Sequence, residues 1–377
     1  MTLQRQRLAA RVFDQAMRFS AFLQAWPQRL TPAPFRLLQI GSAFWQSRAL
    51  HAAAQLDLAT MLGDRRMAAA ELAGAVGAQA DALARLLRFL AAMGVFEEVG
   101  PATYRNNKLS SALRTDRSDN VRAMVLMHNS PEMSRPWFEQ LENGLRSGVP
   151  PFRLTHGADL YDHMDAHPAF DALFAEAMDR VEALTGDSFA TSFDWRAFER
   201  VIDVGGSRGS KSMTILKHHP HLKALVVDRA GTIAAAQTFW REQPQSAALT
   251  ERLSRMAFEA GDVFGTLPVA AGEREAYFMS AVLHGFDDGM AVRALRNVAT
   301  GARPAGAAIV LLEMVMPEHH ADIGAASFDM QMFMGTPGRE RTRVEWDTLF
   351  DRSGVRLAET VHLPSFGKMM VLQPVFG

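Results

Sequence analysis

Residues 201–210 have the types and the spacing of a ligand-binding turn. The run Val-Ile-Asp-Val at 201–204 is apolar around one acid, which is typical of a strand buried on both faces. Gly205, Gly206 and Gly209 follow it. Glycines allow a backbone to turn tightly and to approach a ligand closely, and the free N–H groups of the next helix point the same way. The segment therefore predicts a binding site between a strand and a helix.

The spacing of these glycines differs from that of the dinucleotide-binding loop. They read G-G-x-x-G instead of G-x-G-x-x-G, so the loop alone is a weak signal. A second apolar run, 225–228, ends in Asp228, 25 residues after Asp203. An acid at this place can hold ribose hydroxyls. The loop and the acid together indicate a ligand that contains a ribose.

A histidine follows a later strand of the same kind. His284 comes after the apolar segment 275–282, and Glu313 follows the strand at 308–312. Ligands of open α/β sheets bind outside the carboxyl ends of the strands, so both side chains are expected at the edge that carries Asp228. The unperturbed pKa of histidine, about 6.5, suits proton removal near neutral pH. His284 is therefore a candidate general base, and the alternative is a structural histidine that glutamates satisfy.

The segment 261–264 ends the preceding strand in a similar way. Asp262 offers an acid to an adenine amino group, and the apolar residues after it offer a surface for the adenine ring.

Strand-like segments recur through the second half of the chain, mostly with helical patterns between them. This alternation predicts an α/β fold with a doubly wound sheet. The segments lie at 200–204, 224–228, 254–258, 275–282, 307–315, 355–362 and 369–374.

The first part of the chain is predicted to be helical. Residues 1–30 place apolar side chains at helical spacing, namely Leu8, Val12, Ala16, Phe19 and Leu23. This arm either covers a partner subunit or the mouth of the active site, or it is a loosely docked terminal helix. The Ala- and Leu-rich stretch from residue 35 to about 100 contains three helix-like segments, the last of which Gly94 can cap, and hairpin-like runs come next at 95–99 and 103–105. Helices followed by a hairpin predict a winged-helix unit, and the lack of a concentrated basic face favours dimerisation over DNA binding.

A third helical stretch, 119–185, precedes the glycine loop. Phe170, Phe174 and Met178 lie four residues apart on one face of it. They are either part of the core or the wall of a ligand pocket.

Composition limits the classes of function. The chain has 377 residues, a net charge of −1 and 48% hydrophobic residues, so it can bury a large core and has no overall field for nucleic acid or anionic membranes. It has no cysteine, which excludes disulfides, thiolate metal sites and cysteine nucleophiles. The histidines at 218–221 are expected at a helix end and not at a metal. No apolar run is long enough to span a bilayer, and we expect a cytoplasmic protein without a metal.

These motifs resemble the S-adenosylmethionine-dependent O-methyltransferases of the caffeic acid and hydroxyindole O-methyltransferase type. The resemblance covers almost the whole chain. It rests on Ser47-Arg48-Ala49-Leu50, Arg85-Leu86-Leu87-Arg88, the glycine loop, Gly261-Asp262, Val282-Leu283-His284 and Gly338-Arg339-Glu340-Arg341-Thr342.

The resemblance implies an organisation and a set of site residues. Residues 1–120 would hold the arm and an interlocked winged-helix dimerisation domain, 121–185 would line the substrate pocket, and 186–377 would form a Rossmann-like domain that binds S-adenosylmethionine. His284 matches the general base of the family. The remaining matches are Glu313 and Glu340 as acids beside the base, Gly205, Asp228, Asp262, Val263, Phe264 and Ser280 as cofactor contacts, and Phe170, Phe174 and Met178 as the pocket helix.

The chain departs from the family pattern at three places. Gly285 and Phe286 stand where an acid and an indole usually follow the base. Arg208 stands in the glycine loop, where it either meets the cofactor carboxylate or points into solvent. Pro337 replaces a glycine before the motif that carries Glu340, which should stiffen that loop.

The favoured function is methyl transfer to a hydroxyl of a small aromatic or polyketide-like secondary metabolite by a homodimer. One alternative keeps the fold and acts on nitrogen, carbon or sulfur, or catalyses a rearrangement or hydroxylation without methyl transfer. Another is a winged-helix regulator that senses the cofactor.

Overall fold

The structure is a computed structural model, and it describes residues 12, 15–16, 19, 30–365 and 367–375. Most of the predicted N-terminal arm lies outside the described residues. The chain divides into two compact units. One contains Asn143–Pro151 and Gly186–Gly377, and the other contains Phe22–Glu142 and Phe152–Thr185. The predicted domain boundaries at residues 120 and 185 stay predictions.

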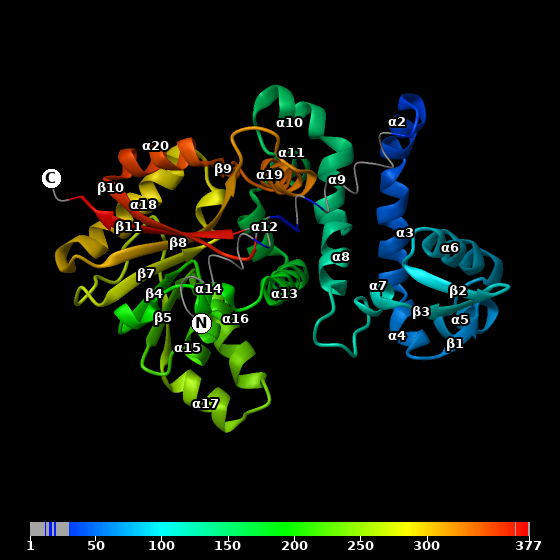
Figure 1. Cartoon of the computed structure of the whole chain (residues 1–377), viewed down its shortest axis with the longest axis horizontal. Helices are drawn as coiled ribbons and strands as arrows, with labels where there is room; N and C mark the ends of the chain where they lie inside the picture. Colours follow the sequence, from blue (N-terminus) through cyan, green and yellow to red (C-terminus); the bar gives the residue numbers. More distant parts are fainter. Residues whose placement is uncertain (1–11, 13–14, 17–18, 20–29, 366, 376–377) are drawn as a thin grey trace. The chain divides into compact units, whose positions relative to one another are not determined.

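The first unit is built around a mixed sheet of eight strands (Figure 1). The strands run in the order β10-β11-β8-β7-β4-β5-β6, and β9 lies beside β8. Their bounds are β4 (Arg200–Val204), β5 (Lys223–Asp228), β6 (Met256–Ala260), β7 (Glu275–Ser280), β8 (Ala308–Met316), β9 (Arg341–Thr342), β10 (Val355–His362) and β11 (Gly367–Pro374).

The sheet is parallel except at one edge. Strands β6, β5, β4, β7 and β8 pair in parallel, whereas β11 and β10 are antiparallel. The predicted α/β class with a doubly wound, mostly parallel sheet is therefore confirmed. Because the strand order reverses between β4 and β7, the carboxyl ends of these two strands border the crevice where such sheets bind ligands.

Helices connect the strands of this unit. They are α14 (Ser188–Thr191), α15 (Ser210–His218), α16 (Ala230–Glu242), α17 (Ala247–Ser254), α18 (Asp288–Ala302), α19 (Ile323–Gly335) and α20 (Arg343–Ser353). Short 3-10 segments lie at η1 (Trp195–Ala197), η2 (Leu283–Gly285) and η3 (Arg303–Ala305). Residues of α10 (Leu141–Ser147) and α11 (Pro151–His156) flank the points where the two units divide.

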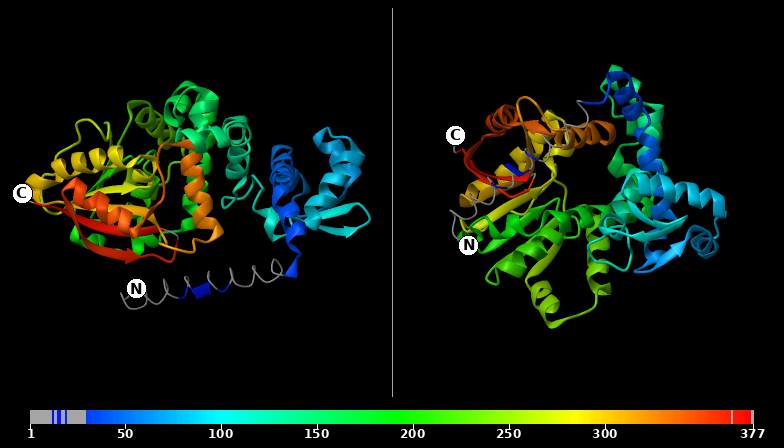
Figure 2. Two further views of the ribbon diagram at one scale, coloured as in Figure 1. Left: turned by 90° about the horizontal axis from the view of Figure 1, so that it is seen from above. Right: turned by 45° about the vertical axis from the view of Figure 1, so that its right-hand side comes forward.

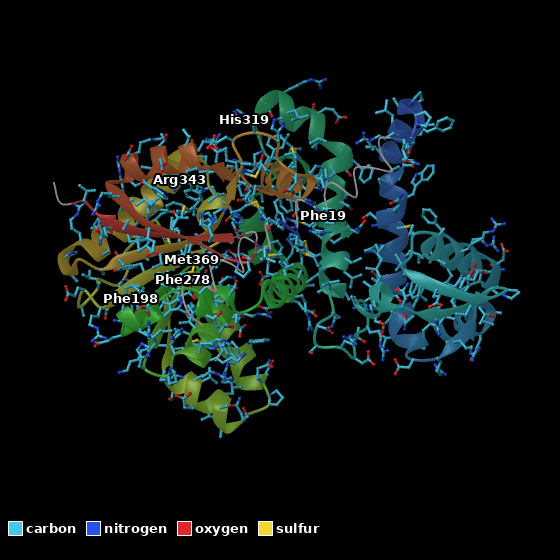
Figure 3. The ribbon with its side chains drawn as sticks, in the orientation of Figure 1. Phe19, Phe198, Phe278, His319, Arg343 and Met369 are labelled. Atoms are coloured by element: carbon cyan, nitrogen blue, oxygen red, sulfur yellow. The ribbon has the colours of Figure 1, made fainter. Side chains whose placement is uncertain are left out.

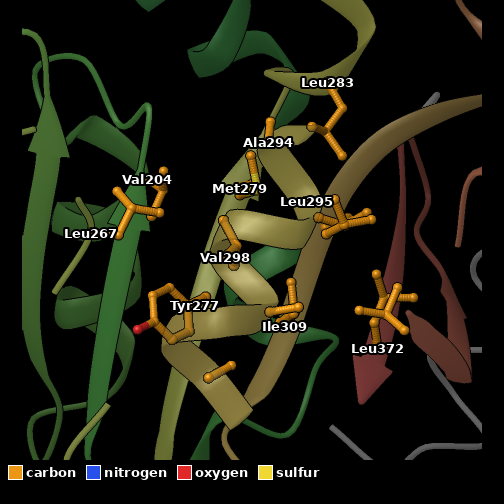
Figure 4. Packing of buried hydrophobic residues seen from close by; sticks show 14 of the residues in the cluster. Val204, Leu267, Tyr277, Met279, Leu283, Ala294, Leu295, Val298, Ile309 and Leu372 are labelled. Atoms are coloured by element: carbon orange, nitrogen blue, oxygen red, sulfur yellow. The ribbon is translucent and has the colours of Figure 1, made fainter. Parts of the chain in front are cut away.

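Successive residues of the central strands enter two cores on opposite faces of the sheet. Tyr277 and Met279 pack in the core that includes α18 and α20 (Figure 4). Phe278 lies between them in sequence and packs with Met369 and Phe198 in the other core (Figure 3). Because side chains alternate along a strand, a strand covered on both faces must be apolar throughout. This explains why the central strands read as continuous apolar runs.

The second unit is helical with a small sheet (Figure 2, blue through cyan to green). Its elements are α2 (Ala33–Gly41), α3 (Ala43–Gln55), α4 (Leu58–Leu62), β1 (Arg66–Ala68), α5 (Ala69–Val76), α6 (Ala80–Ala92), β2 (Phe96–Gly100), β3 (Thr103–Asn106), α7 (Lys108–Ser111), α8 (Arg122–His128), α9 (Pro131–Glu139), α12 (Leu160–Ala166) and α13 (Pro168–Thr185). The predicted hairpin corresponds to β2 and β3, and β1 adds a third strand that the sequence did not indicate. In the part of the chain that the structure describes, no helix is long and apolar enough to cross a membrane.

Candidate active site

Two positions of the loop between β4 and α15 require glycine. Gly205 has φ +74°, and a Cβ added there would lie 2.8 Å from Val282 Cγ2. Gly209 has φ +75°, and a Cβ added there would lie 2.8 Å from Val226 Cγ2. Both the left-handed backbone and the close packing therefore exclude larger residues.

Asp203 holds this loop from within the protein. Its side chain is buried, and Ser212 Oγ donates a hydrogen bond to its Oδ2 at 2.6 Å. A Cβ added at Gly206 would lie 2.6 Å from Asp203 Cγ, so the loop packs directly on this carboxyl group. Asp203, the next-to-last residue of β4, therefore supports the loop.

Asp228, at the end of β5, has a partly buried carboxyl group next to the glycine loop. Its Oδ2 accepts a hydrogen bond from the Ser207 N–H at 2.8 Å, and its Oδ1 accepts one from the Arg229 N–H at 2.7 Å. Burial raises the pKa of Asp228, and these two hydrogen bonds oppose the rise. The Thr232 side chain also hydrogen-bonds this carboxyl group. Because a carboxylate offers about four lone-pair sites, Asp228 can still accept a further donor such as a hydroxyl group. The acid predicted to bind ribose is thus fixed beside the loop.

Residues 261–264 lie against the same strand end. The Gly261 N–H donates to the backbone oxygen of Asp228 at 2.9 Å. The exposed Asp262 accepts the Phe264 N–H on its Oδ1 at 2.9 Å. The Phe264 ring lies 5.0 Å from that of Phe286, and the neighbouring Val263 packs partly into the core. An exposed acid and two apolar side chains therefore occur together here, and their role as adenine contacts stays a prediction.

The end of β7 brings its residues to the glycine loop. Ser280 is the last residue of β7 and is partly buried. Ala281 follows with φ +53°, a left-handed conformation that is uncommon for residues other than glycine. Val282 then contacts Gly205 as described above. The turn that carries His284 begins directly after this contact.

The structure brings His284 together with both glutamates that the sequence named. His284 Nδ1 lies 2.7 Å from Glu340 Oε1 and 4.0 Å from Glu313 Oε2. The side chains of Glu340 and Glu313 are 2% and 0% exposed, whereas that of His284 is 19% exposed. Glu340 therefore makes the direct hydrogen bond. Glu313 instead uses Oε1 to accept the N–H groups of Val282 and Leu283 at 3.0 and 2.9 Å.

The two carboxyl groups beside His284 raise the pKa of its imidazole. Burial lowers the pKa of His284, but the Glu313 charge and the Glu340 hydrogen bond outweigh it, so that the pKa is raised. Burial also raises the pKa of Glu313, and the nearby Glu340 charge adds to this. The charge of a protonated His284 opposes this rise, so the imidazolium and the two carboxyl groups stabilise one another.

The side chains predicted to form a pocket wall lie on α13 in the other unit. Phe170 is buried and its ring lies 6.2 Å from that of Phe174, whereas Met178 is 37% exposed. Phe170 also lines a cavity of about 750 Å³ within that unit, together with side chains of α3 and α9. The role of these three residues as a pocket wall stays a prediction.

The side chain of Arg208, which was expected either at the cofactor carboxylate or in solvent, packs on α16. Its guanidinium carbon lies 4.5 Å from the centre of the Phe239 ring. The Trp240 Nε1–H donates to the Arg208 backbone oxygen at 2.6 Å. The loop is therefore anchored to the helix that follows β5.

Sequence reasoning overlooked Arg341, which it named only as part of a motif. The side chain of Arg341 is 0% exposed and reaches the turn that carries His284. Its position next to Glu340 could have indicated a role near the site, because a residue beside a candidate catalytic acid shares the surroundings of that acid.

Comparison with known proteins identifies the family of this chain. The sequence profile of the O-methyltransferase domain matches residues 138–356, and that of the O-methyltransferase dimerisation domain matches residues 38–116. A 2,7-dihydroxy-5-methyl-1-naphthoate 7-O-methyltransferase from Streptomyces carzinostaticus is 31% identical over 326 residues, which are 86% of this chain and 94% of that protein. An 8-amino-8-demethylriboflavin N,N-dimethyltransferase from Streptomyces davaonensis is 32% identical over 313 residues, which are 81% and 85% of the two chains.

A solved structure shows the same likeness. It is an O-methyltransferase from neocarzinostatin biosynthesis in complex with S-adenosylmethionine and 2-hydroxy-5-methyl naphthoic acid. The TM-score is 0.73 at 29% sequence identity, and the match covers 88% of this chain and 96% of that one. The chain therefore belongs to the family of S-adenosylmethionine-dependent small-molecule O-methyltransferases. The predicted family and the predicted cofactor, S-adenosylmethionine, are confirmed, and the dimerisation domain supports the predicted homodimer.

Proposed function

We propose that this protein transfers the methyl group of S-adenosylmethionine to a hydroxyl of a small aromatic or polyketide-like metabolite, with His284 as the general base. One observation carries the proposal. The turn that bears His284 contacts the glycine loop through Val282, while His284 Nδ1 is bonded to Glu340 at 2.7 Å. The site therefore combines a place for the cofactor with a base whose other ring nitrogen is left for an acceptor.

The residues at this edge of the sheet suit the cofactor. Asp228 would accept hydrogen bonds from the ribose hydroxyls, and Asp262 would accept one from the adenine amino group. Val263 and Phe264 would pack against the adenine ring, and Gly205 and Ser280 would lie near the methionine moiety. When bound, S-adenosylmethionine supplies a sulfonium methyl group that already departs readily.

The protein then has to orient the acceptor, exclude water and remove one proton. Nδ1 of His284 donates to Glu340, which fixes the tautomer and leaves Nε2 to accept the proton of the acceptor hydroxyl. The charges of Glu340 and Glu313 stabilise the imidazolium that forms. In the alternative, His284 would be a structural histidine that the two glutamates satisfy and would accept no proton from the acceptor.

Methyl transfer to nitrogen is the second candidate. The relative at 32% identity is named an N,N-dimethyltransferase that acts on an amino-riboflavin. Gly285 and Phe286, which replace the usual acid and indole, lie directly beside His284. An amine that is already neutral attacks without losing a proton first, so this reaction would depend less on His284.

A panel of acceptors tests the proposal. We would incubate the protein with labelled S-adenosylmethionine and with either 2,7-dihydroxy-5-methyl-1-naphthoate or 8-amino-8-demethylriboflavin, and then with extracts of the source cells. Mass spectrometry locates the label. Label on oxygen supports the proposal, label on nitrogen supports the second candidate, and a product changed without label would assign the protein to the non-methylating relatives.

We predict that Glu340→Gln moves the acid limb of the turnover-pH profile to lower pH. The base must be neutral to accept a proton, so turnover rises with pH through the pKa of His284. Because Glu340 helps to raise that pKa, its neutral replacement should lower it. Turnover at the optimum should also fall, by about tenfold, because a charge-assisted hydrogen bond becomes a neutral one. A limb that stays in place or moves to higher pH would contradict the proposed pairing.

We predict that the protein is a homodimer and that Leu38→Glu weakens it. Helix α2 buries none of its residues in the single chain, and its exposed apolar side chains include Phe35, Leu37, Leu38 and Ile40. An obligate interface buries at least roughly 2,000 Å². Light scattering at micromolar concentration should give about twice 41.6 kDa for the wild type and a lower mass for Leu38→Glu. The control is Gln39→Glu, which adds the same charge at the next exposed residue; a monomeric wild type would refute the prediction.

A further inference from the structure

Arg341 is a buried arginine whose hydrogen bonds surround the turn of His284. Its Nη1 donates to the backbone oxygen of Leu283 at 2.9 Å, and its Nη2 donates to that of Phe286 at 2.8 Å. Its Nε donates to Asp288 Oδ1 at 3.0 Å. The two carbonyl groups belong to the residue before His284 and to the second residue after it. The planar guanidinium therefore binds the backbone on the N-terminal and the C-terminal side of His284.

The backbone N–H groups at the start of the same turn donate to Glu313. This carboxyl group accepts the N–H groups of Val282 and Leu283, as described above. The 3-10 turn itself contributes only two longer backbone hydrogen bonds, from Gly285 N to Val282 O and from Phe286 N to Leu283 O, both at 3.2 Å. A carboxyl group on the N–H side and a guanidinium on the carbonyl side thus hold a turn that has little structure of its own.

The chain segment that carries Glu340 and Arg341 is in direct backbone contact with this turn. A Cβ added at Gly338 would lie 1.9 Å from the His284 backbone oxygen and 2.6 Å from the Phe286 nitrogen. Only a glycine allows this approach. The distance between Glu340 and the imidazole is therefore set by backbone packing at Gly338 and by the reach of Arg341.

We propose that Arg341 is a positioning residue for His284. It touches no reacting atom, and it fixes the carbonyls on both sides of His284 so that Nδ1 faces Glu340 and Nε2 faces the acceptor. This inference rests on the proposed function, in which His284 is the base. His284 and Glu340 lie on two segments that are 56 residues apart in the sequence. The hydrogen bonds of Arg341 join these two segments and so keep the imidazole and the carboxyl group in place.

Arg341→Lys tests this role because it keeps the charge and loses the planar fork. A lysine ammonium cannot hold both carbonyls in the geometry of a guanidinium. We expect turnover of the acceptor identified by the panel to fall about tenfold, with little change in the affinity for S-adenosylmethionine. Labelling with diethylpyrocarbonate, read by peptide mass spectrometry across a pH series, should show a faster reaction of His284 and a changed apparent pKa, while exposed His221 reacts as before. The labelling needs no acceptor.

Arg339→Gln is the matched control. Arg339 also pairs with Asp288, at 2.8 Å, but it is exposed, and the two carbonyl groups of the turn accept their side-chain hydrogen bonds from Arg341 instead. This variant should keep wild-type turnover and wild-type labelling of His284. Equal losses in both variants would show that pairing with Asp288 is what matters, and they would overturn the proposal. The proposal is also overturned if Arg341→Lys shows wild-type labelling of His284 and wild-type turnover of the acceptor, or if Arg341→Lys does not fold.

The labelling separates this proposal from the proposed function. If His284→Ala retains activity, His284 is not the base, yet the labelling of His284 in Arg341→Lys still reports whether Arg341 holds the turn.

Discussion

His284→Ala is expected to lower turnover by roughly 10²–10⁴ while leaving the affinity for S-adenosylmethionine unchanged. The loss follows from removal of the base, because a neutral hydroxyl group is a poor nucleophile until its proton has a place to go. The affinity should survive because the proposed cofactor contacts, at Gly205, Asp228 and residues 261–264, do not include the imidazole. Calorimetry gives the affinity, and single-turnover kinetics with saturating cofactor give the rate of the chemical step.

His319→Ala is the control for this experiment. His319 is exposed on the segment after β8, so its removal should change neither quantity. If His284→Ala methylates its acceptor at nearly the wild-type rate, proximity alone drives the transfer or the acceptor is an amine. A variant that also loses the cofactor would instead assign the histidine a structural role in the turn.

The sequence predicted the fold well because the central strands carry their own signal. Residues 201–204 and 225–228 are apolar at consecutive positions apart from one acid each, which is typical of a strand covered on both faces. The structure has β4 and β5 at these positions. The polar residues that end these strands were placed correctly at one sheet edge, because parallel strands put their carboxyl ends together. This rule brought Asp228, Asp262 and His284 to the same edge without any knowledge of their contacts.

The sequence could not predict how the polar residues divide their tasks. Glu313 and Glu340 were both expected beside the base, but only Glu340 bonds the imidazole, whereas Glu313 bonds the backbone before it. Asp203 lies near the carboxyl end of its strand, as Asp228 does, yet it lies under the glycine loop with Ser212. These differences depend on side-chain directions across segments that are distant in sequence.

Arg341 illustrates the same limit. In the sequence it is one of several arginines in a charged loop, and most arginines are exposed. Its burial depends on Asp288 and on two carbonyl groups of a turn more than 50 residues earlier, and no local pattern records them. The strand β1 was missed for a related reason, since three residues are too few to show alternation.

Asp228→Ala is expected to weaken binding of S-adenosylmethionine by roughly 1.5 to 3 kcal/mol, which is about 10- to 150-fold. Two losses contribute. The variant removes the acceptor for the ribose hydroxyls. It also frees the Ser207 N–H, which now holds the glycine loop to the end of β5, and the N–H of the adjacent Arg229. Asp228→Asn, which keeps one acceptor oxygen and loses the charge, should fall between Asp228→Ala and the wild type in calorimetry.

The pH dependence of this affinity separates the carboxylate from the loop. A protonated Asp228 has only one good acceptor oxygen, so the affinity should fall as the pH is lowered through its pKa. Because burial raises that pKa, the fall should begin at milder acidity than for an ordinary aspartate, and it should vanish in Asp228→Asn. Glu259→Gln, an exposed acid on neighbouring β6, should leave both the affinity and its pH dependence unchanged. Wild-type affinity in a folded Asp228→Ala protein would show that the ribose binds elsewhere, and the whole assignment of this sheet edge would have to be revised.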